Sequence, residues 1–469
     1  MLAAFSGFAR STGAVRAGAV TLVSGLALTG VLSGAGAALA ADDGTPRSQG
    51  GATATINGLK IYGEAVVHED GTDQPVAAGL FEMSVNDGGT LQTYGVDLHN
   101  PVQGDAQYQE TPWSGTSLGA NKNAGRIRWI LQNSYPQVND LAALAREAGA
   151  SGLTEQDAAA GTQVAIWRYS DGAKVDAVDP RAEKLAAYLY KSARDIAEPQ
   201  ASLTLDPPAV SGHPGDLLGP VTVHTNARSV TVTAPADAAY SGVRIIDKTG
   251  NVITSATDGS RLYFDIPEDA ADGSAELAVL ASTTVPVGRA FASESRSPTQ
   301  ILAGSSESTV SAAADVTWAA KGAIPAVSER KNCAKGGVDV TAADKGDLPF
   351  TFELMGAEHT VAPGAAGTVT VPLQEDQPYD FTLTGSNGFS QRFTGVLDCK
   401  TQGVITTQTT QTLSRPGPAV SDPATVDTDL AATGASAVTP MIAGVAIGLV
   451  VIGGAVLVYL RKREMQPGE

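Results

Sequence analysis

The stretch GTQVAIWRYS, residues 161–170, carries one amide side chain among apolar neighbours. It continues a helical pattern that begins at Thr154, where Asp157 three positions later completes a variant of the capping box. Gln163 and Trp167 are four residues apart, so a helix places them on the same face. We therefore expect Gln163 to point into a core, where an amide without hydrogen-bond partners costs about 1–3 kcal/mol.

The sequence around this helix mixes strand and helix patterns. Alternating apolar residues flank the NDGG turn at 86–89 and predict a β-hairpin. Helical periodicity predicts three helices, over 138–149, 154–170 and 181–197. We interpret residues 53–198 as one α+β domain, the head of the chain.

Downstream of the head, short alternating strands separated by turns replace this mixture, which is typical of immunoglobulin-like β-sandwiches. We predict two all-β modules, residues 199–322 and 323–403, with a tight turn at Asn387-Gly388 in the second. The chain has 2 cysteines, Cys333 and Cys399, near the two ends of the second module. A disulfide is the default in an exported chain, and a free reactive thiol pair is the alternative.

Both ends of the chain carry targeting patterns. Residues 1–40 combine two arginines, an apolar run and a small-residue cleavage site, which is the pattern of a secretory signal peptide. Residues 438–460 contain an apolar span long enough for a transmembrane helix, and the basic residues of 461–469 keep that tail cytoplasmic. Residues 404–429 have too few large apolar side chains to fold and are predicted to be a disordered spacer.

A pentapeptide lies between the spacer and the apolar span: Leu430, Ala431, Ala432, Thr433 and Gly434. Together with the span and the basic tail it resembles a sortase sorting signal of the LAxTG type. The resemblance implies that a sortase joins Thr433 to peptidoglycan and that the helix inserts in the membrane only transiently. We expect a secreted protein anchored to a Gram-positive-type cell wall; a permanent membrane anchor is the plainer alternative.

The composition limits the class of partner. The formal net charge of −18 argues against nucleic-acid binding, which needs Lys and Arg to displace counterions. The simplest interpretation of this charge is solubility and mutual repulsion on a crowded surface.

Four motifs in the head resemble one known family. The elements TYGVDLHNP (93–101), YQETPW (108–113), GRIRWILQNSYP (125–136) and TQVAIW (162–167) are similar, in order and spacing, to landmarks of the thioester domains of Gram-positive surface adhesins. In that family a cysteine thiol attacks the glutamine carboxamide, ammonia leaves, and an internal thioester forms. The resemblance implies that Gln163 is this glutamine.

The same resemblance exposes a difference in this chain. The family's cysteine lies in a tyrosine–cysteine–x–aspartate element, which here is Tyr94-Gly95-Val96-Asp97. Gly95 has no nucleophile, and an unactivated hydroxyl such as that of Thr93 is far weaker than a thiol. We therefore predict that Gly95 and Gln163 are the vestigial positions of a thioester that does not form.

The sequence thus predicts a surface protein, an adhesin or surface-interaction protein with an unknown ligand, and no enzyme, cofactor or metal. The alternative is a structural stalk or coat protein of the cell envelope without a specific ligand. An esterase at Ser117 in GTSLG is set aside because the motif lacks a flanking strand and helix. Five histidines lack the spacing of zinc ligands: His68, His99, His213, His224 and His359. Lys248 and Lys345 are candidates for isopeptide cross-links in the β-modules, with an ordinary solvated lysine as the alternative at each position.

Overall fold

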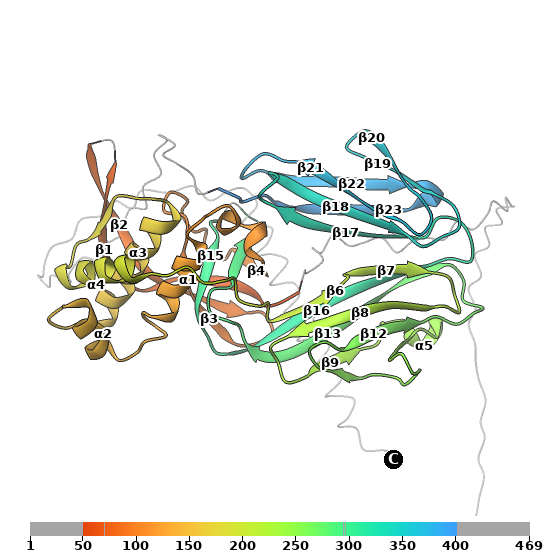
Figure 1. Cartoon of the computed structure of the whole chain (residues 1–469), viewed down its shortest axis with the longest axis horizontal. Helices are drawn as coiled ribbons and strands as arrows, with labels where there is room; N and C mark the ends of the chain where they lie inside the picture. The colour runs from red at the N-terminus through yellow and green to blue at the C-terminus, as the bar shows by residue number, and fades with distance from the viewer. Residues whose placement is uncertain (1–49, 70, 294, 296, 401–469) are drawn as a thin grey trace, which may run out of the picture. The chain divides into compact units, whose positions relative to one another are not determined.

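The computed structural model describes residues 50–69, 71–293, 295 and 297–400 (Figure 1). The predicted signal peptide, spacer, sorting pentapeptide, membrane span and tail all lie outside these residues. Within the described ranges, no helix is both long and apolar enough to cross a membrane.

A seven-stranded sheet forms the centre of the head, with strand order β2-β3-β15-β14-β4-β1-β5. The predicted hairpin is confirmed, because β2 and β3 pair antiparallel through Phe81–Thr93 and Ser84–Thr90. Gly88 and Gly89 in its turn have φ angles of 111° and 109°, which glycine adopts most readily. The strands are β1 (Thr53–Glu69), β2 (Thr72–Val85), β3 (Thr90–Gly95), β4 (Gln107–Thr111), β5 (Val175–Ala177), β14 (Ala290–Ser293) and β15 (Gln300–Ser305).

Four helices accompany this sheet: α1 (Ala124–Gln132), α2 (Leu141–Ala148), α3 (Glu155–Ser170) and α4 (Pro180–Ser192). The capping box at the start of α3 is confirmed, since Thr154 Oγ1 accepts from the Asp157 amide and Asp157 Oδ2 accepts from the Thr154 amide. A Cβ on Gly161 would lie 2.5 Å from the Ala182 carbonyl oxygen, so glycine allows α3 and α4 to approach closely.

One predicted helix is shorter in the structure, and one helix of the structure was not predicted. The predicted helix over 181–197 ends at Ser192, because residues around Asp195 and Ile196 leave the helix and pack against Gly125 at the start of α1. Helix α1 itself falls in GRIRWILQNSYP, for which no element was predicted.

The seven-stranded sheet has a core on each face. Ile301 and Ala303 of β15 belong to the cluster formed with the helices, whereas Leu302 between them belongs to a second cluster. That second cluster continues into the apolar residues of the following module, such as Val221 and Phe264.

The middle module is a sandwich of two sheets, ordered β10-β12-β8-β6 and β11-β9-β13-β16-β7. A short helix, α5 (Ala238–Ser241), joins β9 to β10. The strands are β6 (Leu203–Asp206), β7 (Ala209–Gly212), β8 (Leu217–Thr225), β9 (Val230–Thr233), β10 (Arg244–Ile246), β11 (Ser255–Ala256), β12 (Arg261–Asp265), β13 (Gly273–Thr284) and β16 (Glu307–Trp318).

The predicted boundary between the head and this module is wrong in one respect. Strands β14 and β15 lie within 199–322, which the sequence assigns to the sandwich, yet they fill the head sheet between β4 and β3. Register pairs Gln300 with Gly95 and Phe291 with Glu110. Short alternating strands look the same whichever sheet they join, so periodicity does not identify their partners.

The third module has two sheets, β17-β18-β21 and β20-β19-β22-β23, and the predicted disulfide is present with a Cys333–Cys399 Cα distance of 5.1 Å. Its strands β22 and β23 pair as a hairpin around Ser386–Gly388, near the predicted turn. The strands are β17 (Pro325–Asn332), β18 (Gly337–Asp344), β19 (Phe350–Leu354), β20 (Ala357–Val361), β21 (Ala366–Pro372), β22 (Pro378–Gly385) and β23 (Ser390–Val396).

Candidate functional site

The structure brings the two predicted site positions together, although 68 residues separate them. Gln163 Oε1 accepts a hydrogen bond from the Gly95 amide at 3.1 Å, and Gln163 Nε2 donates to the Gly95 carbonyl at 2.8 Å. Gly95 ends β3 and Gln163 lies midway along α3, so the side-chain amide bonds to the strand in the manner of a backbone neighbour. These two hydrogen bonds satisfy both polar atoms of the buried Gln163 carboxamide.

The site is closed to solvent. Gln163 is 0% exposed, and both atoms of its carboxamide have a partner in Gly95. Neighbouring side chains are equally fixed: the Tyr94 hydroxyl donates to the Tyr135 carbonyl at 2.9 Å, and Thr162 Oγ1 donates to the Ala158 carbonyl at 2.7 Å. Burial raises the pKa of Tyr94, so its hydroxyl stays protonated. Chemically, the arrangement holds an amide without offering it to a ligand.

The aspartate of the family element shapes the loop after β3. Asp97 Oδ1 accepts from the His99 amide at 3.0 Å and from the Asn100 amide at 3.3 Å. Asp171, which follows α3, accepts from the Leu98 amide at 3.2 Å. Desolvation, reinforced by the Asp97 charge, raises the pKa of Asp171 to about 8. The loop is therefore held by an acidic side chain of its own, Asp97, and by one that follows α3, Asp171.

A further carboxyl group reaches this region from the end of the third module. Asp398 Oδ2 accepts from Thr299 Oγ1 at 2.7 Å and from the Thr299 amide at 3.2 Å, and Thr299 directly precedes Gln300. Burial is the main cause that raises the pKa of Asp398 to about 7, and the charges of Asp97, Asp376 and Glu375 add to it. Within the described ranges, Asp398 forms with Glu375 and Asp376 a group of carboxylates within 4.8 Å of one another.

The raised pKa of Asp398 predicts that the stability of the fold depends on pH. Between about pH 4 and pH 7 the folded chain keeps the proton on this carboxyl group while the unfolded chain has lost it, so the folded chain binds more protons. Asp398 should therefore lower stability as the pH rises through this window and contribute no further change above it, whereas Asp171 contributes a fall that continues to about pH 8. We expect Asp398→Asn to flatten this dependence and to raise the unfolding temperature at pH 8 more than at pH 4. Calorimetry of the full chain at both pH values measures it; an equal shift at both would contradict the assignment.

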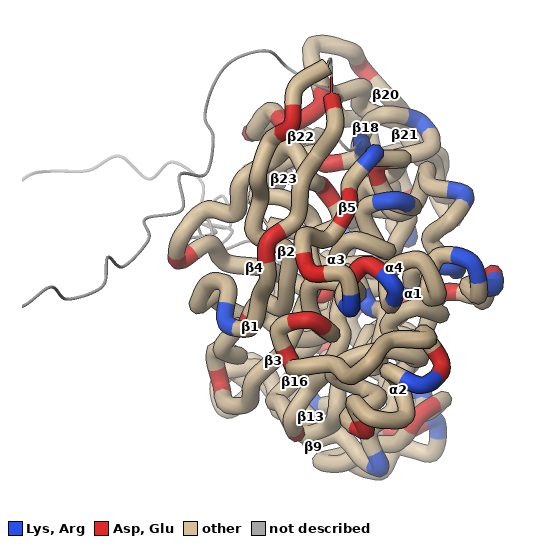
Figure 2. The backbone as a smooth tube through the Cα atoms, turned by 90° about the vertical axis from the view of Figure 1, so that its left-hand side faces the viewer, with Lys and Arg blue, Asp and Glu red and all other residues tan. Residues whose placement is uncertain are grey.

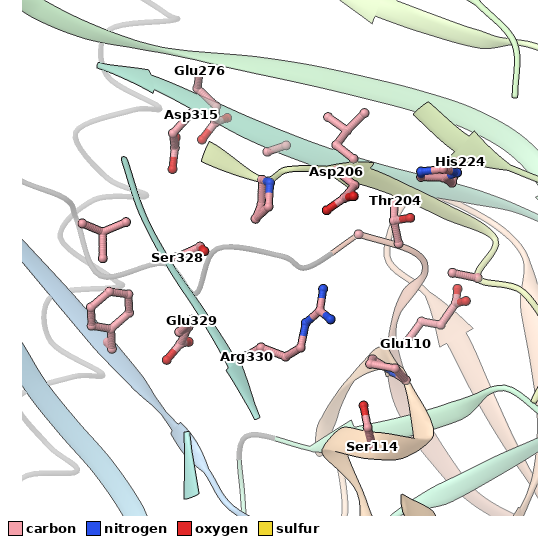
Figure 3. Close-up of a pocket in the computed structure, with 18 of the residues that line it drawn as sticks. Glu110, Ser114, Thr204, Asp206, His224, Glu276, Asp315, Ser328, Glu329 and Arg330 are labelled. Carbon is pink, nitrogen blue, oxygen red and sulfur yellow. The ribbon is translucent and has the colours of Figure 1, made fainter. Parts of the chain in front are cut away.

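A cavity of about 480 Å³ lies apart from the Gly95–Gln163 pair (Figure 3). Its wall combines residues of β4, β6, β8, β13, β16, β17 and β23. Glu276 and Asp315 are direct neighbours across β13 and β16, and Arg330 of β17 points into the space from the other side. Carboxylates and guanidinium groups therefore share the wall with apolar side chains such as Leu205, Val327 and Phe393.

One side of this cavity rests on a buried ion pair. Arg289 Nε donates to Glu110 Oε1 at 2.8 Å, and their side chains are 5% and 0% exposed. The second carboxylate oxygen of Glu110 accepts from Ser202 Oγ and, at 3.2 Å, from the Ala52 amide. Arg289 Nη1 in turn donates to Glu198 Oε1 at 2.8 Å. The pair ties β4 to the segments that enter and leave the middle module.

The remaining sequence candidates stay separate from these groups. Ser117 lies in a single 3₁₀ turn, Ser117–Gly119, preceded by another over Trp113–Gly115, and not on a strand-to-helix elbow. Lys248 and Lys345 are exposed. On the side shown in Figure 2, acidic and basic positions are interspersed over the described chain.

Several residues near the Gly95–Gln163 pair and at the cavity were not predicted from the sequence. They are Gln300, Thr299 and Asp398 near the pair, and Arg289 and Glu110 at the cavity. Gln300 directly precedes the apolar residues of QILAGS. Like Gln163, it is therefore an amide side chain among apolar neighbours, which is the signal that could have identified it. Charge pairing across almost 180 residues, as between Glu110 and Arg289, leaves no local pattern.

Comparison with known proteins agrees with the head motifs. Residues 92–195 match the model of the thioester domain, and residues 323–396 match the model of the bacterial phospholipase C, C-terminal domain. No curated protein matches the chain.

Three solved structures are similar at low identity. The Bacillus anthracis TIE protein is 15% identical with a TM-score of 0.27, over 75% of this chain and 82% of that one. The thioester domain of the Enterococcus faecium TIE86 protein is 15% identical with a TM-score of 0.27, over 57% and 96%. The E. coli chaperone DraB is 12% identical with a TM-score of 0.17, over 42% and 98%. The segment that matches the thioester domain, residues 92–195, is the one that brings Gly95 and Gln163 together.

Proposed function

We propose that this chain is a cell-wall-anchored surface protein, an adhesin or surface-interaction protein, whose thioester-like head does not form the internal thioester. The observation that carries the proposal is the reciprocal hydrogen bonding of Gln163 with Gly95. Gly95, which bonds to the carboxamide, contributes backbone groups only. Without a thiol, the carboxamide remains an amide and holds α3 against β3.

The natural chain tests this chemistry directly. Intact-mass measurement of the protein after processing should give the mass of the residues that processing leaves, with the disulfide and with every ammonia retained. Methylamine should add nothing, because an unactivated primary amide does not react with it. A mass lower by one ammonia, or a methylamine adduct at Gln163, would show that another nucleophile has formed an acyl bond there.

Surface binding is a separate part of the proposal. Because Gln163 is fully buried, a ligand would contact other surfaces of the chain. The cavity beside Arg330 is one candidate binding site. Its alternative, a stalk or coat protein without a ligand, is favoured by the full burial of Gln163. A binding screen of the whole chain against envelope and host surface components separates the two. Saturable binding that Arg330→Glu reduces supports the adhesin, whereas binding to no component supports the stalk.

A further inference from the structure

Position 95 has room for a side chain. Gly95 does not have a positive φ angle, so its backbone suits any residue. A Cβ built there would meet one atom within 4 Å, Gln300 Nε2 at 3.5 Å, which is ordinary van der Waals contact. The backbone therefore does not require glycine at this position, and replacing the family's cysteine by glycine changes the chemistry of the site alone.

Gln300 is held in place from two sides. Its side chain is 0% exposed, and Gln300 lies directly opposite Gly95 in the pairing of β15 with β3. Thr93 Oγ1 donates to Gln300 Oε1 at 3.1 Å, which sets the carboxamide so that its nitrogen lies toward position 95. Nε2 donates to the Pro298 carbonyl at 3.5 Å, at the limit of a hydrogen bond. The Gln300 side chain also has a hydrogen-bond interaction with Tyr108, and its long contact to Pro298 leaves an N–H that can turn to an acceptor at position 95.

The proposed function assigns the position of the vestigial nucleophile to Gly95, and the following inference rests on it. We propose that Gln300 is the positioning residue of this site and donates a hydrogen bond to a side chain at position 95. An anionic sulfur is such an acceptor, and a hydrogen bond to the charged form stabilises it. The Gly95 amide already donates to Gln163 Oε1, the atom on which negative charge develops when a carboxamide is attacked. The site thus retains a donor for the oxygen and a donor for the nucleophile.

Introducing a thiol at this position completes a balanced reaction. In Gly95→Cys the sulfur bonds to the Gln163 carboxamide carbon, the carbon–nitrogen bond breaks, and the nitrogen leaves as ammonia with the proton of the thiol. Gln300 forms no covalent bond in this step. Its contribution is to increase the fraction of thiolate, which is the reactive form.

The experiment compares Gly95→Cys with Gly95→Cys/Gln300→Leu in the full chain. Both natural cysteines are in the disulfide, so the new thiol is the one that titrates in ultraviolet absorbance. To prevent acylation, the titration is done with Gln163→Leu added to both variants. We expect the absorbance midpoint about one pH unit higher without Gln300, which corresponds to about tenfold less thiolate at neutral pH. Ammonia loss from the variants that retain Gln163 should slow about threefold, because a thiolate of higher pKa is also intrinsically more nucleophilic.

Two further variants test folding and the orientation of Gln300. Gly95→Ala adds a Cβ without sulfur and should fold normally without losing ammonia. Gly95→Cys/Thr93→Val leaves Gln300 in place but removes the bond that orients it, and should give an intermediate midpoint. An unchanged midpoint, or faster ammonia loss without Gln300, would overturn the proposal, the latter by showing that Gln300 only obstructs the site. The proposed function fails on a different result, ammonia loss in the natural chain, which has no thiol there.

Discussion

Replacing Arg289 by alanine should destabilise the head and middle module by about 3–5 kcal/mol, because it leaves the Glu110 carboxylate buried without its charge partner. Glu110 keeps its bonds from Ser202 and Ala52, but those neutral donors do not balance a full charge. The same change releases Glu198 and the Pro199 carbonyl, to which Arg289 Nη1 donates at 2.8 and 3.2 Å in the natural chain.

Tryptophan fluorescence in denaturant measures this effect. The chain has 4 tryptophans, Trp113, Trp129, Trp167 and Trp318, and all precede the third module. The matched control is Arg244→Ala, which breaks an exposed pair with Asp265 and should cost less than about 1 kcal/mol. Equal losses in the two variants would mean that the buried pair adds nothing beyond a surface ion pair.

A fragment of residues 42–200 should fail to fold, whereas residues 42–320 should fold cooperatively. The shorter fragment lacks β14 and β15, which pair with β4 and β3 on either side. It would leave two open strand edges in the middle of the sheet and would expose apolar residues such as Leu91 and Tyr108, which are 0% and 1% exposed in the whole chain. An all-or-none loss of structure is the expected outcome.

Near-ultraviolet circular dichroism and limited proteolysis distinguish the two fragments. The matched control keeps residues 42–320 but replaces residues 290–305 by a glycine–serine linker of equal length, and it should behave like the short fragment. A cooperatively folded 42–200 fragment would show that β3 and β4 close the sheet without the returning strands.

The sequence predicts those parts of the site that depend on local spacing. Helical periodicity and the capping box place Gln163 inward, and its carboxamide bonds to Gly95, the residue with which the motif resemblance associates it. Glycines at a turn predict the hairpin before β3 because few other residues adopt those φ angles.

The parts that were not predicted depend on contacts across long stretches of chain. Gln300 lies opposite Gly95 only because β15 returns to the head after the middle module, and 207 residues separate it from Thr93. Asp398 meets Thr299 across 99 residues, at the end of another module. An alternating strand specifies that one face is buried but not which sheet it joins, so these partners are set by the assembled core.

The return of β14 and β15 has a mechanical consequence for a protein held at one end and pulled at the other. The backbone passes between the head sheet and the middle sandwich after α4, again after β13, and once more between β15 and β16. Tension therefore does not draw the two apart by stretching a single linker; it must shear strands out of one sheet or the other. In single-molecule extension the two should rupture together in one force peak, with the third module giving a peak of its own.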